Sequence, residues 1–287
     1  MQTKNIIPFI ALLLFIPIKL SAQSVQIHGE LPPLGLIEKT VYDTAYVKVY
    51  YEYSYRPDSL SMERKDGQTV LLIGDKCTGF SDYYSQRFDF INDSLCYAKR
   101  PPMELFTLGM GLMHKHVYEM PLVIDKESNI AIVQTTKINS FQYEQPVPDI
   151  KWQLQEGDTT LCDVPCKKAV CRFGGRDWTA WYAPSFSMPV GPYLFGGLPG
   201  LIFDIRDTKD NYRFSLNGLE HLKEGVPVYL KNSDDIVKTT REKARKAIEN
   251  IYADVNKAFA LKYEGGNTDG ADQNDSGKRP YNPIELE

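Results

Sequence analysis

Methionine and histidine side chains gather in one short stretch of this sequence. Four of the seven methionines lie between residues 103 and 120, and two of the four histidines lie among them. Thioether sulfur and imidazole nitrogen are ligands that suit cuprous copper. Methionine also fills irregular gaps in apolar cores, so the stretch predicts either a soft-metal site or ordinary packing. The four candidate copper ligands are Met110, Met113, His114 and His116.

The five cysteines offer a second kind of chemistry, and their odd number leaves at least one without a partner in the chain. Cys162 and Cys166 are separated by three residues, one more than in a redox-active Cys-x-x-Cys pair. They fit a strained loop disulfide, a weak metal pair or two unrelated thiols, and the pairing stays open. Cys171 is expected to be a buried, inert thiol.

Familiar catalytic motifs are absent from the sequence. It has no Gly-x-Ser-x-Gly elbow, no His-Glu-x-x-His helix, no Walker loop and no dinucleotide fingerprint. None of the histidines stands beside a credible nucleophile. We therefore predict a non-enzymatic protein with no catalytic residue and with copper as the one alternative cofactor. A hydrolase of an unrecognised type, using Asp204 or Glu220, is a further alternative.

The stretch 191–205 is rich in glycine and proline, and we expect a sharp bend there. Leu198-Pro199-Gly200-Leu201 predicts a type II turn, because proline pre-sets φ and glycine accepts a positive φ. An alternating apolar strand follows from 201. Pro199 has no amide to offer a phosphate and no lysine is present, so a phosphate loop is not favoured. The residues assigned an architectural role are Gly196, Gly197, Leu198, Pro199, Gly200, Leu201 and Ile202.

The clearest hairpin joins 168–173 to 176–182 through Gly174-Gly175, a pair that suits a type I′ turn. Arg172 and Asp177 are expected to form a cross-strand ion pair worth about 0.2–1 kcal/mol. The predicted register places Phe173 opposite Arg176, Arg172 opposite Asp177 and Cys171 opposite Trp178.

Trp181 is an indole on the otherwise polar face of this hairpin. It could stack on a ligand or a partner protein, as aromatic residues do at binding sites. It could equally pack under a loop or helix that covers the face. Trp181 is therefore the candidate residue for ligand or partner contact.

The remaining segments predict a mainly β fold. Eighteen tyrosines and thirteen phenylalanines suit half-buried pleated surfaces. Alternation in 47–55 places three tyrosines and two valines on one face. A turn is expected at 156–158. The other predicted strands are 68–74, 129–136, 150–154, 201–206, 211–216 and 226–230.

Residues 233–262 change to helical spacing, with Ser233 as the expected N-cap and an apolar stripe for docking on the sheet. The fold class we expect is mainly β, a single curved antiparallel sheet or open half-barrel with this C-terminal amphipathic helix packed on it. Residues 263–287 are expected to be a disordered tail that ends in an Asn-Pro-Ile-Glu-Leu motif.

Residues 1–22 are typical of a secretory signal peptide, with Lys4, an apolar run from Ile6 to Ile18 and small residues at Ser21-Ala22. Its removal leaves 31 basic and 37 acidic residues, a formal charge of −6. That balance argues against nucleic-acid binding. We expect a protein that is located in the periplasm, associated with the outer membrane or secreted, and that does not span the membrane once the signal is cleaved.

Several motifs together resemble the GLPGLI family of Bacteroidota. They are Trp152-Gln-Leu154, Cys166-Lys-Lys-Ala169, Phe173-Gly-Gly-Arg-Asp-Trp-Thr-Ala-Trp-Tyr182, Gly191-Pro-Tyr-Leu-Phe195, Gly197-Leu-Pro-Gly-Leu-Ile202 and the terminal Asn282-Pro-Ile-Glu-Leu286. The family usually has a Gly-Tyr pair before the cysteine at Cys166, where this chain has Asp163-Val164 and the additional Cys162.

The resemblance implies that residues 23–262 form one exported domain with no established activity and no catalytic residues. An accessory role at the cell envelope follows as an expectation. The partner would be an outer-membrane or periplasmic protein, or a small apolar or peptide-like ligand.

Overall fold

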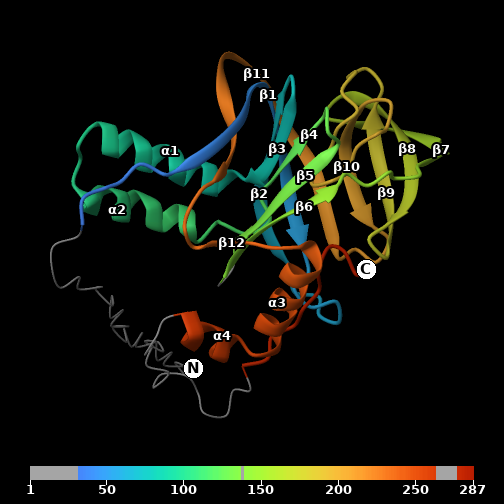
Figure 1. Ribbon diagram of the computed structural model, residues 1–287. Coiled ribbons are helices and arrows are strands. Elements are labelled where there is room, and N and C mark those ends of the chain that lie inside the picture. Colours follow the sequence, from blue (N-terminus) through green and yellow to red (C-terminus); the bar gives the residue numbers. More distant parts are fainter. Residues whose placement is uncertain (1–31, 137–138, 263–276) are drawn as a thin grey trace, which may run out of the picture. The chain divides into compact units, whose positions relative to one another are not determined.

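A computed structural model of the chain describes residues 32–136, 139–262 and 277–287 (Figure 1). All its elements belong to the unit formed by residues 33–287. The expected signal peptide, and residues 263–276 of the expected tail, lie outside the described residues. No helix among the described residues is long and apolar enough to cross a membrane.

The described strands form one large sheet that stays open. Its order is β12-β6-β5-β4-β3-β2-β1-β11-β10-β9-β8-β7, and every neighbouring pair is antiparallel except β12 with β6. This confirms the mainly β class and the antiparallel sheet. The strands are β1 (Lys39–Tyr55), β2 (Lys65–Gly74), β3 (Cys77–Asp82), β4 (Leu122–Asp125), β5 (Ile130–Thr136), β6 (Ser140–Pro146), β7 (Gln153–Leu161), β8 (Val164–Phe173), β9 (Arg176–Ala183), β10 (Leu201–Asp207), β11 (Tyr212–Lys231) and β12 (Ile236–Lys238).

Strand β1 lies near the middle of the sheet, between β2 and β11. Its alternation buries Val49, Tyr51 and Tyr53 in the main core, as the pattern of 47–55 predicts. Tyr53 stacks on Phe214 with ring centroids 4.9 Å apart, and its ring also contacts those of Tyr55 and Tyr118. The core is therefore unusually aromatic on this side of the sheet.

The β8–β9 hairpin has the predicted register, including the Arg172–Asp177 ion pair with a distance of 3.1 Å between Nη1 and Oδ1. Gly174 and Gly175 have φ values of 57° and 73°, as a type I′ turn requires.

Two other turn predictions are wrong. Residues 156–158 lie within β7, where the pairing with β8 shifts register between Gln155 and Asp158.

The second wrong turn is the one expected at Leu198–Leu201. A type II turn would bond the Leu201 amide to the Leu198 carbonyl, but that amide donates to the Phe186 carbonyl at 3.1 Å. The Gly200 amide donates to the Leu198 carbonyl at 2.8 Å instead. Gly200 is required for a different reason: a Cβ placed there would lie 2.2 Å from the Ala183 carbonyl oxygen.

The helices are α1 (Tyr83–Tyr97), α2 (Pro102–Met113), α3 (Arg241–Ala253) and α4 (Val255–Lys262). Helix α1 packs against β2 and β3, α2 lies beside α1, and α3 lies against β6 (Figure 1). The predicted helix start near Ser233 is wrong, because β12 intervenes and Thr240 caps α3.

Asp82 links the start of α1 to the segment that follows α2. One carboxylate oxygen accepts hydrogen bonds from the amides of Tyr84 and Ser85, which is an N-cap. The other oxygen accepts from the amides of Val117 and Tyr118, each at 3.0 Å. A single buried side chain therefore fixes the backbone position of Tyr118.

We expect Gly200→Ala to lower the free energy of unfolding by about 3 kcal/mol or more, because the new methyl group meets backbone that cannot move aside. Gly197→Ala is the matched control. Its φ is 84°, but a Cβ there has no atom within 4 Å, so only backbone strain of about 1–2 kcal/mol applies. Urea unfolding of both variants checks this, and equal losses would contradict it.

Candidate functional site

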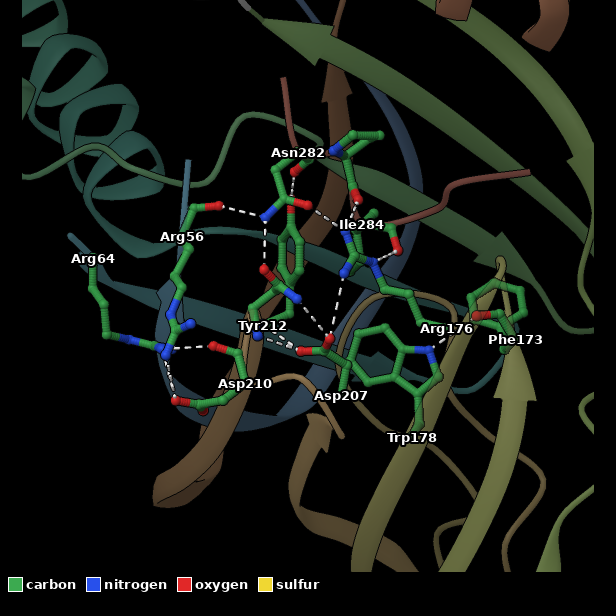
Figure 2. A network of polar contacts seen from close by, with 12 residues as sticks. Arg56, Arg64, Phe173, Arg176, Trp178, Asp207, Asp210, Tyr212, Asn282 and Ile284 are labelled. Carbon is green, nitrogen blue, oxygen red and sulfur yellow. Dashed lines mark hydrogen bonds and ion pairs between the residues drawn. The ribbon is translucent and has the colours of Figure 1, made fainter. Parts of the chain in front are cut away.

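The side chain of Arg176 is buried at the start of β9 and is the centre of a polar network (Figure 2). Its Nη1 atom lies 3.3 Å from Oδ2 of Asp207, and the two side chains are 4% and 2% exposed. The guanidinium also lies over the ring of Tyr212, with 5.0 Å from Cζ to the ring centroid. A buried guanidinium of this kind needs acceptors for its remaining donors.

Those acceptors come from the last residues of the chain. Nε of Arg176 donates to the Ile284 carbonyl at 2.9 Å, and Nη2 donates to the Pro283 carbonyl and to Oδ1 of Asn282, each at 2.6 Å. Asn282 in turn donates to the carbonyl of Arg56 at 2.7 Å. Three consecutive residues are therefore bound by one side chain.

Each carboxylate oxygen of Asp207 accepts two hydrogen bonds, which offsets the free-energy cost of burying its charge. Its Oδ1 accepts the amides of Asn211 and Tyr212 at 2.6 and 2.7 Å. Its Oδ2 accepts Nδ2 of Asn211 at 3.1 Å as well as the guanidinium. The turn between β10 and β11 is thus built around this carboxylate.

The Gly174-Gly175 turn receives the end of the same terminal segment. The amide of Leu286 donates to the Gly174 carbonyl at 2.7 Å. A Cβ at Gly174 would lie 2.8 Å from Cγ of Glu285. Residues 282–286 are thus held against the core, with Asn282, Ile284 and Glu285 buried. This part of the expected tail is a structural element, which corrects the prediction for it.

The docked segment forms one wall of a cavity of about 120 Å³, which we call the tyrosine cavity. Strands from the middle of the sheet, residues 117–120 and helix α3 form the other walls. Apolar side chains such as Val117, Met120 and Ile248 complete the lining. Eight tyrosines among the described residues line it: Tyr53, Tyr55, Tyr118, Tyr143, Tyr193, Tyr212, Tyr252 and Tyr281.

Tyr118 is the exceptional member of this lining. Its side chain is buried, and its hydroxyl has no hydrogen-bond partner within the described part of the chain. Tyr118 belongs to the lining of the cavity, and its hydroxyl is itself buried. An unpaired buried hydroxyl costs free energy unless something binds to it.

The charged groups of the lining serve mainly to hold the terminal segment. The Glu285 carboxylate accepts from the hydroxyl of Tyr193 and, at 2.6 Å, from Nη2 of Arg241. Arg245 donates to the backbone carbonyls of Glu285 and Glu287. Glu119 is the second carboxylate in the lining. Because Glu285 is bound on both oxygens, the pair does not have the arrangement of an acid and a base that are free to exchange protons.

Burial raises the pKa of Tyr53, Tyr118, Tyr193 and Tyr212 well above the ordinary value of 10. The negative charge of Glu285 adds to this effect at Tyr193. These phenols are therefore neutral hydrogen-bonding groups at physiological pH. The cavity presents aromatic faces and hydroxyls, without an ionised phenolate that could act as a base.

The predicted copper ligands lie outside the lining of the tyrosine cavity. Two are exposed methionines at the end of α2, and two are histidines that follow the helix in the chain. One ring nitrogen of His116 already lies 3.0 Å from the Tyr118 carbonyl oxygen. No group of three or more His, Cys, Asp or Glu residues in the described chain could hold a metal ion. Copper binding through Met110, Met113, His114 and His116 stays a prediction.

The other predicted residues lie outside the lining of the tyrosine cavity. Trp181 is half-buried against the main core, with Gly157 of β7 beside it, so its ligand role stays a prediction. Asp204 accepts from Arg213 at 3.0 Å, and Glu220 accepts from Tyr50. Of the motif residues, 196–200 precede β10, and Leu201 and Ile202 are its first two residues, so the architectural role of the motif stays a prediction.

All five cysteines are free thiols. Burial raises the pKa of Cys166 to about 11 and that of Cys171 to about 12, so both are protonated and unreactive at neutral pH. Cys171 is buried as predicted.

Arg176 and the terminal segment are the features that the sequence did not reveal. The predicted hairpin already placed Arg176 opposite Phe173, on the core face, where a charged residue requires a buried partner. That conflict was the available signal. The sequence did not show which distant residues would satisfy it.

We expect Arg176→Met to lower the free energy of unfolding by about 3–5 kcal/mol, because it leaves the Asp207 charge buried without its partner. The control is Arg172→Met in the same hairpin, whose ion pair with Asp177 is well exposed and contributes less than about 1 kcal/mol. Urea unfolding compares the two. A loss below 1 kcal/mol for Arg176→Met would show that the network does not hold the fold.

We expect stability to fall at alkaline pH. The unfolded tyrosines ionise near pH 10, whereas the raised pKa values keep the buried ones neutral in the folded protein. Stability is therefore retained below pH 10 and lost as the pH rises above it, by about 1.4 kcal/mol per pH unit for each such tyrosine.

Tyr53→Phe should make the loss of stability with pH less steep by about 1.4 kcal/mol per pH unit, the contribution of one buried tyrosine. Tyr97→Phe, at an exposed position of α1, should leave the slope unchanged. Urea unfolding between pH 9 and 11 measures the slopes. The same slope in Tyr53→Phe and the parent would contradict the burial of this phenol.

No protein-family model matches this chain, and no curated protein matches it. Among solved structures, PNGF-II in its P21 and C2 crystal forms gives TM-scores of 0.47 and 0.45, each at 10% sequence identity. The matches cover 74% of this chain and 34% of the PNGF-II chain, so this chain spans about a third of that protein's length. A similarity of this size carries no argument about function.

Proposed function

We propose that this chain is an exported, non-enzymatic binding protein of the cell envelope, and that its ligand occupies the tyrosine cavity. The ligand would be small and largely apolar, with one ring and one polar group. The observation that carries the proposal is Tyr118, a residue of the cavity lining whose buried hydroxyl has no hydrogen-bond partner in the described residues.

The lining supports a ring-shaped apolar ligand. Tyrosine faces accept other rings edge-on or in offset stacks, and they bury apolar area at a small cost in side-chain entropy. Ligand sites in proteins are typically apolar cavities with a few well-placed polar groups. Val117, Met120 and Ile248 supply apolar contact, and Tyr118 supplies the polar group.

The size of the cavity limits the ligand. An apolar cavity of about 150 Å³ is large enough to bind benzene. At about 120 Å³ the tyrosine cavity accepts one small ring or one side chain of a peptide-like ligand. A larger ligand would have to displace part of residues 281–285, which form the wall.

The cellular part of the proposal rests on the sequence. Residues 1–22 support export to the periplasm or beyond, and the motifs from Trp152 to Ile202 support membership of the GLPGLI family. In this proposal the sheet is an open half-barrel of the carrier type, and α3 closes the cavity over it. Trp181 remains the proposed contact for an envelope protein partner.

We expect the protein to bind phenol more tightly than benzene, by up to roughly tenfold, because phenol can bond to the Tyr118 hydroxyl. In Tyr118→Phe the two ligands should bind equally. Tyr97→Phe, on exposed α1, is the matched control and should keep the preference. Titrations followed by NMR shifts of the cavity tyrosines measure both affinities.

Two further outcomes decide the proposal. Tyr118→Phe should be at least as stable as the parent, since it removes a buried hydroxyl that lacks a partner. If neither ligand shifts the cavity tyrosines, or if the preference for phenol survives in Tyr118→Phe, the cavity is not the site that we propose.

A further inference from the structure

Helix α2 carries an exposed apolar stripe that the proposed ligand site does not use. Glu104 is the single charged residue in the helix, and it is paired with Arg100 at 2.5 Å. The members of the stripe are Met103, Phe106, Met110 and Met113, with exposed fractions between 37% and 63%.

The spacing of these residues places them on one face. Steps of three, four and three residues keep side chains within one side of a helix. The helix contacts α1 through Gly109, where a Cβ would lie 2.6 Å from the ring of Phe88. Leu108, outside the stripe, is also exposed, so α2 is an apolar helix that presents much of its apolar surface to the solvent.

Helix α1 adds to the exposed apolar surface of this helical pair. Phe90 and Tyr97 are 66% and 76% exposed. Single exposed apolar residues are ordinary, but a stripe along a whole helix is the pattern of a surface that binds a partner or a membrane.

The charged side chains of residues 83–116 indicate which kind of partner this apolar surface binds. The acidic side chains of residues 83–116 are all paired: Asp89 with Lys231, Asp93 with Lys39 and Glu104 with Arg100. The basic side chains that have no acidic partner among the described residues are Arg87, Lys99 and Lys115. In a chain of net charge −4, residues 83–116 thus carry positive charge that no acidic side chain of the described residues pairs with.

We propose that residues 83–116 bind the surface of an anionic phospholipid membrane, with the α2 stripe inserted at the boundary between headgroups and acyl chains. Interfacial helices combine an apolar stripe with flanking lysine and arginine in this way. Each basic residue near an anionic surface contributes about 1 kcal/mol. With 12 residues, α2 is too short to cross a bilayer and can only lie in its surface.

This inference is independent of the tyrosine cavity. The stripe and the cavity lining share no residue. A failure of phenol binding would therefore leave it standing, and its own failure would leave the ligand site unaffected.

Flotation of the full chain with vesicles tests the inference. We expect binding to vesicles of phosphatidylcholine with 30% phosphatidylglycerol, and at least tenfold weaker binding to pure phosphatidylcholine. Phe106→Ser with Met110→Ser should weaken binding to the anionic vesicles at least tenfold. Both positions are exposed, so the double variant should fold and keep its phenol affinity.

The matched control is Leu60→Ser with Met62→Ser, an exposed apolar pair in the β1–β2 connection, which should bind like the parent. Three results would overturn the inference. They are no binding to anionic vesicles, equal weakening by the control pair, and a dimer in sedimentation that the Phe106 and Met110 changes dissolve while vesicle binding is absent.

Discussion

The buried guanidinium of Arg176 is the constraint on which the rest of this structure depends. A planar group with five donors and a permanent charge cannot be placed in a core unless acceptors surround it. Asp207 provides one, and the backbone and side-chain oxygens of residues 282–284 provide the others. The chain end is therefore drawn into the core by an electrostatic requirement of a hairpin more than a hundred residues earlier.

That requirement also creates the tyrosine cavity. Once residues 282–286 lie along the Gly174-Gly175 turn, their inner side faces the tyrosines of β1, β6 and β11. Helix α3 fixes the same segment from the other side through Arg241 and Arg245. The cavity is thus formed by elements from the whole length of the domain, and the backbone of Tyr118, one of its lining residues, is held by the Asp82 cap of α1.

Local patterns predicted those parts of the fold that local interactions determine. The β8–β9 register follows from a two-glycine turn, and the burial of β1 follows from simple alternation. The predictions were wrong where a distant contact decides the geometry. Gly200 is needed because the Ala183 carbonyl approaches it, and α3 starts at Thr240 because β12 occupies the preceding residues. The composition of 263–287 suggested a tail, whereas residues 282–286 make buried hydrogen bonds with residues far away in the sequence, which local composition does not show.

Hydrogen exchange at the amide of Leu286 tests most directly whether the terminal segment is part of the core. This amide donates to the Gly174 carbonyl at 2.7 Å, inside the region that Arg176 organises. We expect this amide to exchange only when the whole domain unfolds, with the same opening free energy as the amides of β9. Exchange at the rate of an unstructured chain, while β9 stays protected, would contradict it.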